Sequence, residues 1–159
     1  MKTRDAAIAN ARSSFDSGEF RAMLARRVAV PTESQNPERG PVLRQYLEQE
    51  IGPSFEAMGF SCRILDHAKA KAPFLLAERI ESSDATTVLG YGHGDVIRGL
   101  DREWHEGLSP WTLTDREGRW YGRGIADNKG QHSINMEALR HVIGTRGKLG
   151  FDAKFLIEM

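Results

Sequence analysis

Residues 86–96 read Thr-Thr-Val-Leu-Gly-Tyr-Gly-His-Gly-Asp-Val, an apolar run typical of a strand followed by a glycine-rich end. His93 and Asp95 lie two residues apart in this stretch, so in an extended chain they project to the same side. Ligands of open α/β folds bind at the carboxyl ends of strands, which makes His93 a candidate metal ligand and Asp95 a candidate partner of its imidazole. The alternative is a solvated histidine at an ordinary glycine-rich strand end.

The hydrophobic pattern on either side of this stretch alternates between helical and strand periods. It predicts further strands at 61–65, 74–80, 119–121 and 153–157, and a turn-rich loop over 97–118. Helices are predicted at 17–28 with Ser17 as cap, at 39–58 with a kink or restart at Pro53, and at 130–143 with Ile134 on the buried side and Gly144 at the end. Together these elements favour an α/β sandwich with helices on both faces of the sheet.

Composition limits the classes of function. The 159 residues fit one domain, and 22 basic residues balance 22 acidic ones without a basic cluster, so nucleic acid is not an expected partner. No secretory core follows Met1, and no apolar run approaches the ~20 residues of a membrane span, so we expect a cytoplasmic protein with no membrane partner. Cys62 is the only cysteine, which leaves imidazole and carboxylate as metal ligands.

A second glycine-rich segment covers 122–130 and reads Gly-Arg-Gly-Ile-Ala-Asp-Asn-Lys-Gly. Asp127 lies on this loop just before the last predicted helix, where a carboxylate has two oxygens with which to bridge two ions. An ordinary aspartate at a helix entry is the alternative. Neither glycine-rich segment completes a dinucleotide fingerprint or a nucleotide P-loop.

Five other side chains receive less specific interpretations. We expect His105 to be an ordinary loop histidine and His141 to lie on the polar side of its helix. We expect Trp104 and Trp111 to anchor the long loop. His132 lies one turn into the last helix, and we expect it near the mouth of the site, touching substrate or solvent.

The segments taken together resemble a known family. The order and spacing of His93-Gly94-Asp95-Val96, Trp104, Ser109-Pro110-Trp111, Gly118, Tyr121-Gly122-Arg123-Gly124 and Asp127-Asn128-Lys129-Gly130 are similar to those of the co-catalytic zinc peptidases. That family includes acetylornithine deacetylase, succinyl-diaminopimelate desuccinylase, aminoacylase, carboxypeptidase G and carnosinase. Val30-Pro31-Thr32-Glu33-Ser34 and the segment from Leu47 to Phe60 resemble the family's opening helices, so the similarity covers nearly the whole chain.

The resemblance implies a site with two zinc ions, where cobalt or manganese is also admissible. His93 is expected to bind one zinc, Asp127 to bridge both and to precede a cis peptide bond, and Asp95 to orient His93. The implied reaction is hydrolysis of an amide bond in an N-acyl amino acid or small peptide. The implied full-length protein is a homodimer.

The family's general base and a further zinc ligand form a Glu-Glu pair after the strand that here reads Lys154 to Met159. Glu158 falls before that position and is not its substitute. We therefore expect residues 1–159 to be the N-terminal part of a three-layer α/β/α zinc-exopeptidase-like catalytic domain with a central mixed sheet, lacking the general base and the dimerisation domain and inactive alone. The alternative is a non-catalytic fragment or interaction module that retains the fold.

Overall fold

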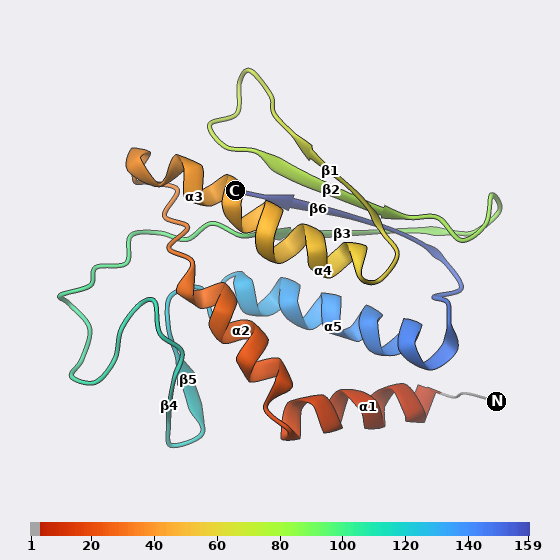
Figure 1. The fold of residues 1–159 in the computed structure, drawn as a ribbon, viewed down its shortest axis with the longest axis horizontal. Helices are drawn as coiled ribbons and strands as arrows, with labels where there is room; N and C mark the ends of the chain where they lie inside the picture. Colours follow the sequence, from red (N-terminus) through yellow and green to blue (C-terminus); the bar gives the residue numbers. More distant parts are fainter. Residues whose placement is uncertain (1–3) are drawn as a thin grey trace.

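The computed structural model describes residues 4–159 (Figure 1). Residues 1–3, which open the segment where we expect no secretory core, lie outside the described part. The helices are α1 (Arg4–Asp16), α2 (Glu19–Ala29), α3 (Gly40–Tyr46), α4 (Gly52–Glu56) and α5 (Lys129–Arg146), with a 3₁₀ turn at Pro37–Arg39 and a π-helical turn at Leu47–Ile51. The strands are β1 (Ser61–Leu65), β2 (Phe74–Arg79), β3 (Thr87–His93), β4 (Thr114–Arg116), β5 (Arg119–Tyr121) and β6 (Asp152–Glu158).

Four strands form a mixed sheet in the order β1-β2-β6-β3, and β4 and β5 form a separate hairpin. β1 and β6 both run antiparallel to β2, whereas β3 runs parallel to β6. The expected α/β class with a mixed sheet is therefore confirmed. The parallel pairing brings the carboxyl ends of β3 and β6 to one edge, where His93 lies opposite Glu158.

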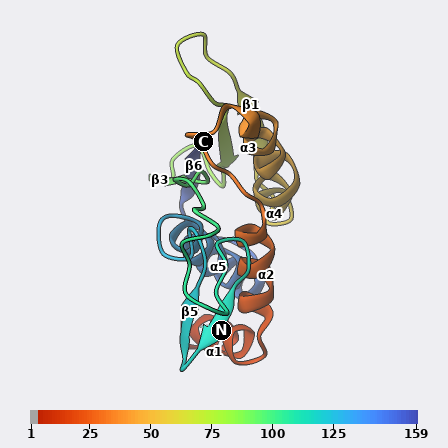
Figure 2. The same ribbon diagram turned by 90° about the vertical axis from the view of Figure 1, so that its left-hand side faces the viewer.

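A single hydrophobic cluster joins the α3–α4 segment, one face of the sheet and α5. Its largest members include Tyr46, Phe55 and Met136 from the helices and Phe155 and Ile157 from β6. Figure 2 shows α3 and α4 lying along one side of the sheet. On the opposite face the side chains of Leu89 and Tyr91 are 71% and 57% exposed, so within residues 4–159 the second helical layer of the expected arrangement is not seen.

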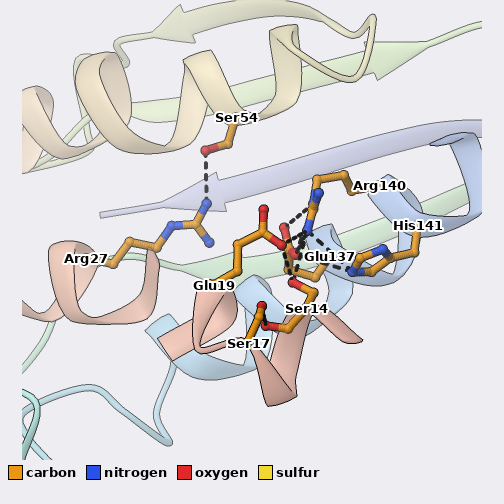
Figure 3. A network of polar contacts seen from close by, with 8 residues as sticks. All are labelled: Ser14, Ser17, Glu19, Arg27, Ser54, Glu137, Arg140 and His141. Carbon is orange, nitrogen blue, oxygen red and sulfur yellow. Dashed lines mark hydrogen bonds and ion pairs between the residues drawn. The ribbon is translucent and has the colours of Figure 1, made fainter. Parts of the chain in front are cut away.

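Helices α1 and α2 pack on α5 through a polar network (Figure 3). The Arg140 guanidinium of α5 donates to the Glu137 carboxylate at 2.7 Å and to the Ser14 hydroxyl of α1 at 3.2 Å. Ser14 in turn donates to the Glu19 carboxylate of α2 at 2.7 Å. These contacts tie the first two helices to the helix that begins beside Asp127.

The helix boundaries differ from the predictions in four places. The predicted helix at 39–58 is divided into α3, the π-helical turn and α4, which ends at Glu56. α1 was not predicted, and α2 begins after Gly18, in the left-handed conformation, rather than with Ser17 as cap. α5 continues past Gly144 to Arg146 and ends at Gly147. Ile134 is 58% exposed, so the prediction that it faces the core is wrong.

None of the helices in the described part of the chain is long and apolar enough to cross a bilayer.

Candidate metal centre

His93 ends β3 with both ring nitrogens engaged by oxygen atoms. Its Nδ1 lies 3.0 Å from the Asp95 carboxylate and 3.1 Å from the Asp95 carbonyl oxygen. A carbonyl and a carboxylate only accept, so Nδ1 donates to Asp95, and Nε2 is the ring nitrogen that faces Asp127. The structure thus brings His93 and Asp95 together in the arrangement that prepares a histidine to bind a metal ion through Nε2.

Asp127 lies across from Nε2 of His93 although it is 34 residues away in the sequence. Its Oδ1 is 3.0 Å from His93 Nε2, and its side chain is 85% exposed. The peptide bond that follows, Asp127-Asn128, is cis, as the family resemblance implied. Asn128 rather than Asp127 occupies the N-cap position of α5, and it makes no side-chain cap hydrogen bond, so Asp127 is not a helix-capping aspartate.

The spacing of these two groups fits two ligands of one ion. With metal–ligand distances of about 2.0–2.2 Å, two donors at a tetrahedral zinc lie about 3.4 Å apart. The observed 3.0 Å between Nε2 and Oδ1 requires a shift of a few tenths of an ångström. Across residues 4–159 no group of three or more His, Cys, Asp or Glu side chains is placed to hold an ion. The pair therefore fits part of a zinc site.

The glycines around His93 serve the packing behind it. A Cβ at Gly94 would lie 2.6 Å from the Tyr46 ring, and one at Gly92 would lie 3.0 Å from His132 Cβ. Both neighbours are buried side chains. Glycine at these two positions therefore makes room for core side chains.

The Asn128 side chain connects β3 to α5, a contact that the sequence pattern did not reveal. Its Oδ1 accepts from the His93 backbone N–H at 3.3 Å and lies 3.4 Å from His132 Nδ1. His132 is 1% exposed, and its Nε2 lies 3.0 Å from the Tyr46 hydroxyl. Burial, reinforced by the charge of Arg27, lowers the pKa of His132 to about 3. The expectation that His132 faces substrate or solvent is wrong.

Lys129 follows Asn128 and is fully buried. Its ammonium donates to the backbone carbonyls of Arg27 at 2.8 Å and Val30 at 2.6 Å, and lies 4.9 Å from the centre of the Tyr46 ring. Burial lowers the pKa of Lys129 to about 7. These partners lie 99 and 102 residues away, so no local signal in the sequence could have found them.

The remaining candidates behave as structural residues. The indole N–H of Trp104 donates to the Gly99 carbonyl and that of Trp111 to Asp101, so both anchor the loop as expected. His141 lies 3.6 Å from the Glu137 carboxylate with its side chain only 10% exposed, so it is not solvated. Glu158 accepts from the Tyr91 hydroxyl, which raises the pKa of Tyr91 to about 12.

Comparison with known proteins gives a consistent set of relatives. Residues 89–159 match the model of peptidase family M20/M25/M40. The Beta-Ala-His dipeptidase of Mus musculus is 31% identical over 153 residues, which cover 88% of this chain and 30% of that protein. The acetylornithine deacetylase of Proteus mirabilis is 28% identical over 123 residues, which cover 77% of this chain and 31% of that protein.

Among solved structures, human carnosine dipeptidase 1 superimposes with a TM-score of 0.82 at 28% sequence identity. The alignment covers 97% of this chain and 34% of that one. The chain thus spans between 30% and 34% of the length of these relatives.

Proposed function

The chain is related by sequence and by fold to peptidase family M20/M25/M40, and on that premise we propose that it supplies part of the active site of a metal-dependent hydrolase. The substrates are amide bonds in dipeptides or N-acyl amino acids, the classes named for the dipeptidase and deacetylase relatives. The observation that carries the proposal is the position of His93 Nε2, which lies 3.0 Å from the Asp127 carboxylate while Nδ1 is held by Asp95.

Each of the three polar side chains has a separate role. His93 would hold one zinc ion through Nε2, and Asp127 would hold both zinc ions through its exposed carboxylate. Asp95 holds the His93 ring through Nδ1 and keeps the tautomer that binds metal. Bound zinc supplies Lewis-acid chemistry, because it polarises a scissile carbonyl and acidifies water. Cobalt or manganese is compatible with the same imidazole and carboxylate donors.

The rest of the apparatus lies outside these 159 residues in our proposal. A zinc enzyme site uses about three or four protein ligands, and His93 and Asp127 are two. β6 ends beside His93, which places that edge of the sheet next to the site. We propose that residues 1–159 form the N-terminal part of the catalytic domain and do not catalyse hydrolysis alone. A cytoplasmic location and a homodimeric whole protein remain predictions.

Calorimetric zinc titration and hydrolysis of a panel of dipeptides and N-acetyl amino acids test the proposal on the full-length protein. His93→Ala and Asp127→Ala are expected to weaken zinc binding by more than about 100-fold and to abolish the chelator-sensitive hydrolysis, since both remove direct donors. His105→Ala is the matched control, because this loop histidine is not part of the site.

Hydrolysis that survives either of the first two substitutions would show that the proposed metal roles are wrong. Absence of metal binding in the unmutated protein would favour a non-catalytic interaction module. Tight binding of two zinc ions by residues 1–159 alone would contradict the division of the site between this chain and the rest of the protein.

A further inference from the structure

Residues 30–34, Val-Pro-Thr-Glu-Ser, leave the end of α2 and run past both segments of the candidate metal centre; we call them the strap. Glu33 forms a bridge parallel to Val96, just beyond Asp95. Val30 accepts a hydrogen bond from Lys129, just beyond Asp127. The strap is therefore in contact with the chain on both sides of the site.

On the His93 side, the strap holds the peptide between His93 and Asp95. The Thr32 hydroxyl donates to the Gly94 carbonyl at 2.7 Å, and Thr32 is 0% exposed. The Gly94 N–H donates to the Glu158 carbonyl of β6 at 2.8 Å. Gly94 is thus fixed by its N–H to the sheet and by its carbonyl to the strap, and the only side-chain group in this clamp is the Thr32 hydroxyl.

The same contact continues along the backbone. The Val96 N–H donates to the Thr32 carbonyl at 2.8 Å, and the Ser34 N–H donates to the Val96 carbonyl at 3.1 Å. The Glu33 carboxylate accepts from the Gly99 N–H at 2.7 Å. The segment that carries Asp95 is therefore paired with the strap over several residues.

On the Asp127 side, the contact is made by the buried side chain of Lys129. Lys129 donates to the carbonyls of Arg27 and Val30, which lie at the carboxyl end of α2 and the start of the strap. Carbonyls at a helix carboxyl end have no partner within the helix and carry partial negative charge, so a buried ammonium is stabilised there. Lys129 thereby fixes the start of α5, two residues from Asp127, to the strap.

We propose that the strap sets the distance between His93 and Asp127, and that the Thr32 hydroxyl is a positioning residue for the metal site. The inference rests on the proposed function, because it concerns the geometry of the same two ligands. Productive sites require their groups within about 0.5 Å of the working geometry. Without the hydrogen bond from Thr32, Gly94 can move, and the position of the neighbouring His93 becomes less precise. The imidazole itself remains able to bind a metal ion.

Three substitutions in the full-length protein separate positioning from stability. Thr32→Val keeps the shape and removes the hydroxyl, and it is expected to weaken zinc binding about tenfold, the lower end of the usual effect of groups that orient metal ligands. Thr32→Ser keeps the hydroxyl and is expected to restore zinc affinity to within about twofold of the unmutated protein, even where the lost methyl lowers stability. Thr145→Val is the matched control.

Thr145 is 4% exposed, and its hydroxyl accepts from Asn10 at 3.0 Å, away from the site, so this variant also removes the hydrogen-bonded hydroxyl of a buried threonine and should bind zinc normally. The inference is overturned if Thr32→Val binds zinc as tightly as the unmutated protein. The proposed function is still supported in that case if His93→Ala abolishes zinc binding. Equal losses in Thr32→Val and Thr32→Ser also overturn it. Failure of the unmutated protein to bind zinc overturns both proposals.

A measurement on the unmutated protein keeps the inference falsifiable if Thr32→Val does not fold. Coupling between two sites is reciprocal, so zinc bound at His93 and Asp127 should slow hydrogen exchange at the Ser34 and Val96 amides of the strap pairing. We expect at least about threefold slower exchange there and no change at the Gly147 amide at the end of α5. Unchanged exchange at Ser34 and Val96 in the zinc-loaded protein overturns the inference.

Discussion

Gly130 and Gly144 lie in the same helix, α5, and we predict opposite effects when each is replaced by alanine. A Cβ at Gly130 would lie 1.8 Å from the Ile125 carbonyl oxygen, whereas one at Gly144 would have no heavy atom within 4 Å. An ordinary carbon–oxygen contact is about 3.3 Å, so the start of α5 or the Ile125 carbonyl must move by about 1.5 Å in Gly130→Ala. The obstacle is backbone, which has no rotamer with which to avoid it.

The two effects can be estimated separately. Alanine gains about 1 kcal/mol over glycine in a helix interior, and this is the whole expected effect of Gly144→Ala. Overpacking costs about 1–3 kcal/mol, and a clash against backbone falls at the upper end, so Gly130→Ala should lose about 2 kcal/mol net. The free energies of unfolding of the two variants should therefore differ by about 3 kcal/mol, or more than 100-fold in the unfolding equilibrium.

Urea denaturation of both variants at pH 7 measures this difference through the midpoint at constant slope. Gly130→Ala should also weaken zinc binding, because Asp127 lies three residues before the displaced glycine. A Gly130→Ala protein at least as stable as Gly144→Ala would refute the placement of Gly130 against Ile125.

Three further predictions concern α5 and His93. Met136→Ala should destabilise the protein by about 2–4 kcal/mol, and Ile134→Ser by less than about 0.5 kcal/mol, in the same denaturation assay, because only Met136 is buried. The pKa of His132 is lowered from 6.5 to about 3 in the folded protein, so at pH 5 the histidine is protonated in the unfolded chain and neutral in the folded protein. Its contribution to the free energy of unfolding is therefore complete above pH 6.5, and about 2 kcal/mol is lost on acidification to pH 5. His132→Gln should remove this part of the pH dependence of stability. Asp95→Asn should weaken zinc binding about tenfold by calorimetry, and an unchanged affinity would contradict its role on His93 Nδ1.

The strands were predictable from sequence because their signal is local. β1 and β5 have the predicted bounds, β2 ends one residue earlier than predicted, and β3 and β6 differ from their predictions by one or two residues at each end. α1 (Arg4–Asp16) was missed, and its buried residues, Ala7 and Ser14, are small and carry little apolar signal. What fixes this helix includes the polar contact between Ser14 and Arg140, which joins residues 126 apart.

The buried face of α5 was predicted wrongly for a physical reason that concerns the site. Apolar periodicity selects the stripe through Ile134, but the start of α5 buries Lys129, His132 and Ser133 instead. A hydrophobic pattern cannot identify a face that is buried and polar. Where a helix begins behind a functional site, its first turn is the part least predictable from apolar residues alone.

For the site, the proximity of His93 and Asp95 followed from their spacing on a strand end, and the structure places His93 Nδ1 3.0 Å from the Asp95 carboxylate. The proximity of Asp127 to His93 did not follow from any local pattern and came from the family resemblance. The contacts of the strap could not be predicted, because Thr32 and Lys129 donate hydrogen bonds to backbone carbonyls. Every residue has such a carbonyl, so the sequence does not indicate which one is used.

The polar interior behind the candidate metal centre explains why the strap and α5 are held so closely. Burying Lys129 and Arg27 is costly unless their donors find acceptors, and no carboxylate pairs with either among the described residues. Lys129 is satisfied by carbonyls of α2 and the strap, and Arg27 by the hydroxyls of Ser133 at 2.5 Å and Ser54 at 3.0 Å, while Arg27 Nε has no partner. These partners are available only when α2, α4 and α5 are docked together. Docking of those helices therefore fixes the position of the strap, and the strap in turn fixes the positions of the residues on either side of the candidate metal site.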